Sequence, residues 1–139
     1  MPERMTKLYI DTNVIRDMIE DRKNLFGSSL GDPAAKIFTE AVNCKYYLII
    51  SDWTLRELYK YVEPSSARMF FKIIKPKIIP QDYTEEDKKR ARERSEEHPD
   101  DALHIILAEK ANADIIITSN TQHFNQISTH IPIKKPKHL

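Results

Sequence analysis

Cysteine and glycine are scarce in this chain. Cys44 is the only cysteine among 139 residues, so neither an internal disulfide nor a zinc site built from several cysteines can form. Gly27 and Gly31 are the only glycines, and no Gly-rich phosphate-binding loop is present. No apolar run approaches the roughly 18 residues of a membrane-spanning helix, and the first residues lack the apolar stretch of a secretory signal. These absences predict a protein of the reducing cytoplasm with no membrane segment.

Charge of neither sign prevails. The 22 basic and 21 acidic residues give a net charge of +1, which does not favour general nucleic-acid binding. A local basic surface remains open at Lys72, Lys75 and Lys77 and in the segment 134–137, although these lysines also fit a solvated surface. Hydrophobic residues make up 40% of the chain, which predicts a folded protein, and its length predicts a single domain over residues 1–139.

Short apolar runs alternate with helical patterns along the chain. Five runs are typical of buried strands, and the fifth contains a proline that predicts an edge strand: 8–10, 46–50, 77–79, 115–118 and 131–133. Helices are predicted over 33–42, along an apolar stripe from 55 to 62, from 65 or 66 to 74, and over 84–97. A surface loop is expected over 27–31. This alternation predicts an α/β fold with a parallel sheet covered on both faces.

Four polar side chains fall at the ends of these elements. Asp11 and Asn120 each follow a strand-like run, Asp101 begins a helix, and Glu57 lies off the apolar stripe of its helix, facing away from the core. Each alone has an ordinary explanation as a helix cap, a first-turn acid, a surface glutamate or a turn residue. In an open parallel sheet, however, ligands bind beyond the carboxyl ends of the strands. The four positions together therefore predict a functional cluster.

A cluster of carboxylates implies a cation. Three such groups within a few ångströms repel one another and stay ionised together only around a positive ion. Oxygen ligands favour Mg²⁺, Mn²⁺ or Ca²⁺ over zinc, and a water bound to such an ion can attack phosphorus in line. His104 stands three residues after Asp101 and could also bind a metal. Because no second histidine accompanies this pair, we expect His104 to be a half-buried imidazole.

Four segments resemble, in order, the motifs of PIN-domain ribonucleases. The segment 9–14 is similar to their opening motif, a hydrophobic strand that ends in Asp-Thr-Asn. The segment 51–58 resembles the second motif, a helix that carries a glutamate, and 100–108 resembles the third, an acid at a helix start. The segment 114–124 is similar to the fourth, a strand that closes in Thr-x-Asn before a phenylalanine, and 131–136 resembles the last strand.

The resemblance implies a three-layer α/β/α PIN-like fold with a five-stranded parallel sheet. It also implies an enzyme that uses Mg²⁺ or Mn²⁺ to hydrolyse phosphodiester bonds in single-stranded RNA. Carried over by motif position, the catalytic residues are Asp11, Glu57, Asp101 and Asn120. The first three of these would bind the metal, and Asn13 and Thr118 would support the site through hydrogen bonds.

The sequence departs from the family pattern at one place. Family members usually carry a further acid at position 120 or 123, where this chain has Asn120 and His123. Two interpretations therefore stay open. The first is an endoribonuclease, as in toxins of the VapC type, with an antitoxin protein as partner. The second is a catalytically weak or inactive PIN-fold module that binds RNA or protein. Aromatic residues in 59–71 leave a homodimer open beside ordinary core packing.

Overall fold

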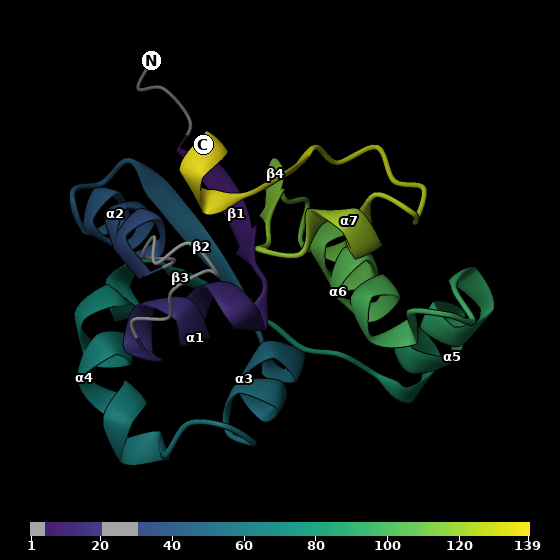
Figure 1. Ribbon diagram of the computed structural model, residues 1–139, viewed down its shortest axis with the longest axis horizontal. Helices are drawn as coiled ribbons and strands as arrows, with labels where there is room; N and C mark the ends of the chain where they lie inside the picture. Colours follow the sequence, from purple (N-terminus) through teal and green to yellow (C-terminus); the bar gives the residue numbers. More distant parts are fainter. Residues whose placement is uncertain (1–4, 21–30) are drawn as a thin grey trace.

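Five parallel strands form one sheet at the centre of the protein. The computed structural model describes residues 5–20 and 31–139 (Figure 1), so the loop expected over 27–31 lies outside the described residues except for Gly31, which begins a helix. The strand order is β3-β2-β1-β4-β5, and every pairing is parallel. The predicted α/β fold is confirmed, with these strands: β1 Thr6–Ile10, β2 Tyr46–Ser51, β3 Ile78–Gln81, β4 Ile115–Ile117 and β5 Ile133–Lys134.

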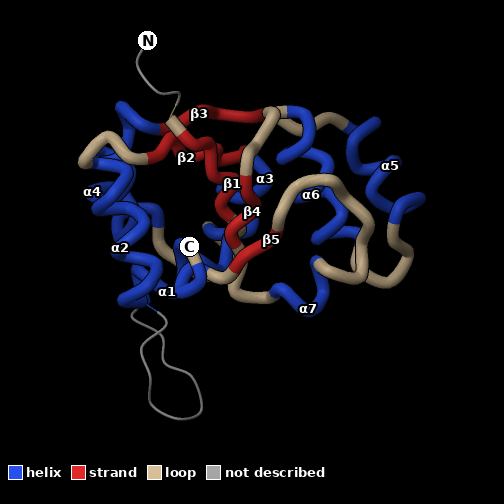
Figure 2. Tube along the Cα trace, turned by 90° about the horizontal axis from the view of Figure 1, so that it is seen from above, coloured by secondary structure: helices blue, strands red, loops and turns tan. Residues whose placement is uncertain are grey.

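Helices cover both faces of the sheet, which lies between them in Figure 2. One face is covered by α1 (Thr12–Glu20), α2 (Gly31–Val42) and α4 (Pro64–Ile74). The other face is covered by α5 (Glu85–Arg94), α6 (Pro99–Lys110) and α7 (Thr121–Phe124). Helix α3 (Asp52–Leu58) contributes to both cores, and short 3-10 turns span Lys75–Lys77 and Pro136–His138. None of the described helices is long and apolar enough to cross a membrane.

Alternation along the strands builds the two cores. In β1, Leu8 and Ile10 join the core under α1, α2 and α4, whereas Tyr9 joins the core under α6. The central strands are therefore buried on both faces and appear in the sequence as continuous apolar runs. The edge strand predicted from Pro132 is confirmed, since this proline immediately precedes edge strand β5. Pro80 likewise lies in an edge strand, β3.

Two predicted helices end earlier than expected. Helix α3 stops at Leu58, because the backbone N–H groups of Lys60 and Tyr61 bond to the carbonyls only three residues back, those of Glu57 and Leu58, and the chain turns towards the next helix. Val62 is still buried. Its place in the apolar repeat of residues 55 to 62 therefore reflects burial and not helical structure. Helix α5 stops at Arg94 instead of Glu97. Its predicted start is confirmed, because Thr84 and Asp87 form a capping box.

The strand order places a topological switch between β1 and β4. The chain adds strands outward from β1 on one side, to β2 and β3, and then returns to the other side for β4 and β5. Ligand sites in such sheets lie beyond the carboxyl ends of the two strands at the switch. Here those ends lead to Asp11 and Thr118, and the Asp11 N–H bonds to the Ile117 carbonyl at 3.0 Å.

The four-residue helix α7 depends on a single buried side chain, Phe124, which is fully buried in the core under α6. We expect Phe124→Ala to lower the free energy of unfolding by about 3–5 kcal/mol, because it leaves a cavity in a packed core. The exposed Gln126→Ala, two residues on, should change it by less than about 0.5 kcal/mol. Urea denaturation of both variants measures the difference, and equal effects would contradict this account of α7.

Candidate active site

Asp11 is buried at the end of β1 with both carboxylate oxygens engaged. Its Oδ2 accepts a hydrogen bond from Thr118 Oγ1 at 2.8 Å, and its Oδ1 accepts one from the Thr12 backbone N–H at 2.8 Å. Burial raises the pKa of Asp11, and the charge of His104 and the Thr118 hydrogen bond offset this only in part. The carboxylate is thus held in one orientation where it needs a nearby positive charge to stay ionised.

Glu57 reaches from α3 to the same place. Its Oε1 accepts a hydrogen bond from Thr12 Oγ1 at 2.7 Å and lies 2.6 Å from His104 Nε2. The side chain is half-buried and lies off the apolar stripe of its helix, as predicted, reaching over the end of β1. Burial alone would raise the pKa of Glu57, but hydrogen bonds and the charge of His104 outweigh it and lower the pKa overall.

His104 lies between these two carboxylates. Its side chain is 1% exposed, so it is fully buried and not half-buried as expected. Nε2 approaches Glu57 Oε1 at 2.6 Å and Asp11 Oδ1 at 3.3 Å. The pairing was not foreseeable from spacing along one helix, because Glu57 and Asp11 come from other elements. Asp11, Glu57 and His104 therefore form one group, called the Asp11 group below.

A chain of hydrogen bonds fixes the proton on the other nitrogen of His104. The Ile10 carbonyl can only accept, so Thr54 Oγ1 donates to it at 3.4 Å. Ser51 Oγ donates to Thr54 Oγ1 at 3.0 Å, and the Tyr9 hydroxyl must then donate to Ser51 Oγ at 2.8 Å. The Tyr9 oxygen can only accept from His104 Nδ1, 2.7 Å away. Nδ1 of His104 therefore carries a proton.

The remaining nitrogen faces two carboxylates that accept hydrogen bonds. Burial alone would lower the pKa of His104, but Tyr9 and the carboxylates of Glu57 and Asp11 raise it well above its ordinary value of 6.5. In this arrangement His104 is an imidazolium whose Nε2–H satisfies both acids. Loss of that proton would leave the Nε2 lone pair directed at the same point as the two carboxylates. Two oxygens and one nitrogen are a donor set that fits a divalent metal ion.

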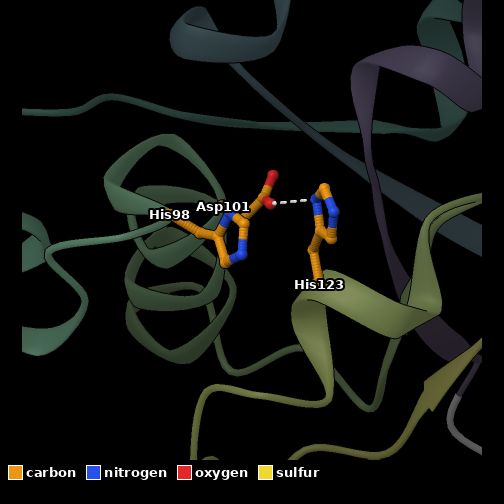
Figure 3. Close-up of side chains that lie close together, drawn as sticks. All are labelled: His98, Asp101 and His123. Carbon is orange, nitrogen blue, oxygen red and sulfur yellow. Dashed lines mark ion pairs between the residues drawn. The ribbon is translucent and has the colours of Figure 1, made fainter.

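Asp101 lies beside this group but has different neighbours. Burial raises the pKa of Asp101, as does the negative charge of Asp11, so the two carboxylates sense each other. Its side chain contacts His123, whose Nδ1 is 3.5 Å from Asp101 Oδ2 (Figure 3). Among the described residues, ligand atoms gather within 4.8 Å of one another in two groups, the Asp11 group and a second made of His98, Asp101 and His123. The three predicted acids are therefore divided between two adjacent groups.

The other predicted residues differ in how close they lie to the acids. Thr118 is buried and bonds directly to Asp11. Asn120 follows β4, and its Nδ2 lies 2.7 Å from Nδ1 of His123. Asn13 is half-buried in the first turn of α1, and its side chain has no hydrogen bond to Asp11 or Glu57 in the described structure.

Sequence reasoning missed four contributors to the site. Thr12 and Tyr9 flank the aspartate of the first motif, but nothing in the pattern distinguishes Tyr9 from an ordinary core residue. His98 stands three residues before Asp101, the spacing already noted for His104, and this signal could have identified it. His123 was recognised only as a departure from an expected acid.

Comparisons with known proteins agree with the fold and the motif order. The profile of the family described as "PIN domain" matches residues 7–122, most of the chain. Among solved structures, the chain is similar to one in the crystal structure of VapBC2 from Rickettsia felis bound to a DNA fragment from their promoter. The TM-score is 0.63, the sequence identity is 16%, and the alignment covers 94% of this chain and 98% of that one. No curated protein matches by sequence.

The charge state of His104 predicts how stability depends on pH in metal-chelating buffer. Because the folded protein holds this proton more tightly than the unfolded one, the stabilisation is complete below pH 6.5 and is lost as pH rises through the higher folded pKa. Over that window we expect the free energy of unfolding to fall by up to about 1.4 kcal/mol per pH unit.

Urea denaturation over a pH series, with NMR titration of the His104 ring, measures this dependence. Tyr9→Phe serves as the comparison, since it removes the acceptor of the Nδ1 proton. The variant should lower the pKa of His104 and shorten the window. A His104 ring that titrates at its ordinary value of 6.5 in the wild type would refute the buried imidazolium.

Proposed function

The chain belongs to the PIN-domain family, and from this premise we propose that it is a metal-dependent endoribonuclease acting on single-stranded RNA. The observation that carries the proposal is the Asp11 group at the switch point of the sheet, with Asp101 beside it. A site with fixed carboxylates at this place suits a divalent cation and a phosphodiester substrate. Phosphodiester hydrolysis is the reaction that such a donor set supports best.

We assign the roles as follows. Asp11, Glu57 and Asp101 bind the cation, and Asn120 completes the catalytic set. Thr118 holds Asp11 Oδ2, so that Oδ1 is the oxygen that faces Glu57 and His104. Asn13 supports the site from the start of α1, next to Thr12, which already bonds to Glu57.

The cation is Mg²⁺ or Mn²⁺. When bound, such an ion stabilises the charge that develops at the scissile phosphate and lowers the pKa of a coordinated water. This chain's own contribution is to hold the carboxylates in place, and an ion held by Asp11 and Glu57 would compete with the Nε2 proton of His104 for their charge. Without that proton, Nε2 of His104 would offer a nitrogen donor beside the carboxylates, which would favour Mn²⁺ over Mg²⁺, since Mg²⁺ prefers oxygen.

The biological role that we propose is the toxin of a toxin–antitoxin pair, with an antitoxin protein as its partner. The support is the likeness of fold to a chain of the VapBC2 structure together with the family match. Tyr59 and Tyr61 are exposed beside α3 and provide aromatic surface for such a partner or for a second copy of the chain in a homodimer.

A second candidate function is a PIN-fold module that binds RNA or protein with little or no cleavage. The observation in its favour is His104, because an imidazolium in contact with Asp11 and Glu57 already balances part of their charge without a metal ion. The two candidates differ in one measurable property. The enzyme requires a divalent ion to cleave RNA, whereas the module binds RNA regardless of the ion.

Asp11→Asn and Asp101→Asn should each abolish Mn²⁺-dependent cleavage of mixed single-stranded RNA, because each removes one charge that holds the ion. Asp100→Asn is the matched control for Asp101, since Asp100 is the adjacent, exposed acid in the same helix turn. It should cleave like the wild type. The assay follows product formation with Mn²⁺ and with EDTA, and circular dichroism checks the fold.

The outcomes separate the two candidates. Cleavage lost with EDTA and in both variants supports the enzyme. RNA binding without cleavage at any Mn²⁺ concentration supports the module. Cleavage that persists in both variants would show that these acids are not the site.

Glu57→Gln should reduce the cleavage rate at least about tenfold, the lower end of what loss of a group around a metal costs. The amide keeps the size of the side chain but loses the charge that faces His104. Glu63→Gln is the control, because Glu63 is exposed just before α4. Rates measured at several Mn²⁺ concentrations show whether added ion rescues Glu57→Gln, and wild-type turnover in this variant would remove Glu57 from the site.

A further inference from the structure

A second group of metal-ligand side chains lies next to the Asp11 group. His98 immediately precedes α6, Asp101 lies in the first turn of α6, and His123 lies in α7 (Figure 3). Each can offer one ligand atom so that the three atoms lie within 4.8 Å of one another. The residues come from two helices that meet only in the folded chain. We call them the His98 group.

We propose that the His98 group binds a first-row transition-metal ion. Of the two ions tested below, it should bind Zn²⁺ more tightly than Mg²⁺. Two imidazoles and one carboxylate form a mixed nitrogen and oxygen set of the kind that binds Zn²⁺, Co²⁺ or Ni²⁺. Mg²⁺ discriminates against such a set because it prefers oxygen ligands and gives up its waters reluctantly. The proposal concerns metal binding alone and does not depend on nuclease activity.

The separation of His123 and Asp101 suits ligands of one ion. Nδ1 of His123 accepts a hydrogen bond from Asn120 Nδ2 at 2.7 Å, so it carries a lone pair and no proton. That lone pair lies 3.5 Å from Asp101 Oδ2, which is also an electron-pair donor. Two ligands of a tetrahedral zinc ion, each about 2.0–2.1 Å from the metal, lie roughly 3.3 Å apart. A metal ion would bind this lone pair of His123 in place of the Asn120 N–H group. The Asn120 amide must then turn aside.

His98 and His123 require one rearrangement before both can bind. Their rings are stacked, with centroids 4.2 Å apart and planes inclined by 16°, and two nearly parallel rings cannot both direct a nitrogen at one ion. The His98 ring is the one that must turn, because His123 Nδ1 and Asp101 Oδ2 already lie at the separation of two ligands of one ion. The torsion that turns an imidazole is broad, so the rotation costs little. The backbone of His98 is held by the bond from its N–H to Ser95 Oγ at 2.9 Å, which leaves the torsions of its ring free.

The test is calorimetric titration with Zn²⁺ and Mg²⁺ on protein free of any polyhistidine tag. In a Glu57→Gln background, which weakens the Asp11 group, we expect one zinc ion to bind. His98→Ala and His123→Ala in that background should each weaken Zn²⁺ binding at least about tenfold. His138→Ala is the matched control, because His138 is exposed in the 3-10 turn Pro136–His138 and should change nothing.

A second measurement covers variants that fold poorly. In the wild-type protein, Zn²⁺ should shift the NMR signals of the His98 and His123 rings together, and Mg²⁺ should not. The proposal is overturned if neither ring responds to Zn²⁺, if both alanine variants bind zinc like the control, or if Asp11→Asn abolishes zinc binding while they do not. The last result would assign the zinc to the Asp11 group, and the first would leave the contact of His123 with Asp101 without a role in metal binding. Because no RNA is present, none of these results depends on the nuclease proposal.

Discussion

The contact of His104 with Asp11 and Glu57 is the interaction on which the site depends. Carboxylates buried at the end of a parallel strand are costly unless a positive charge accompanies them, and removal of one member of such a set leaves an uncompensated charge. His104 supplies that charge from the opposite layer of the fold. The arrangement explains why an ionisable side chain is fully buried among the apolar residues of α6.

The same contact links the site to the core of the protein. His104 Nδ1 is held by Tyr9, and Tyr9 continues through Ser51 and Thr54 to the Ile10 carbonyl. This chain of hydrogen bonds joins α6 to β1, β2 and the start of α3, so the orientation of the imidazole is set by three other elements. In the proposed enzyme, the proton on Nε2 and the divalent ion compete for the same negative charge. The metal-free protein would then hold its carboxylates ready at the positions where the ion binds.

Much of the fold could be predicted because its signals are local. The apolar run that leads to Asp11 identifies a buried strand. The proline before β5 identifies an edge strand, and both signals lie within a few residues of the chain. The end of α3 could not be predicted, since Val62 keeps helical spacing although the backbone has already turned. The sequence identified Asp11, Glu57 and Asp101 as candidates, but not the histidines that the structure places beside them. Their convergence depends on how α6 packs against α3 and α7, which no spacing within one segment encodes.

The replacement of an expected acid by His123 changes the charge balance of the whole site. Asp11, Glu57 and Asp101 carry three negative charges, which one divalent ion would offset only in part once it has displaced the His104 proton. An additional carboxylate would help to hold a second ion by adding charge. Neutral imidazole nitrogens instead donate lone pairs and add no negative charge. A second ion bound by His98 and His123 would therefore leave the site with a net positive charge. A positive cleft attracts phosphate, and the exchange of acid for histidine would then shift part of the binding energy from the metal to the RNA backbone.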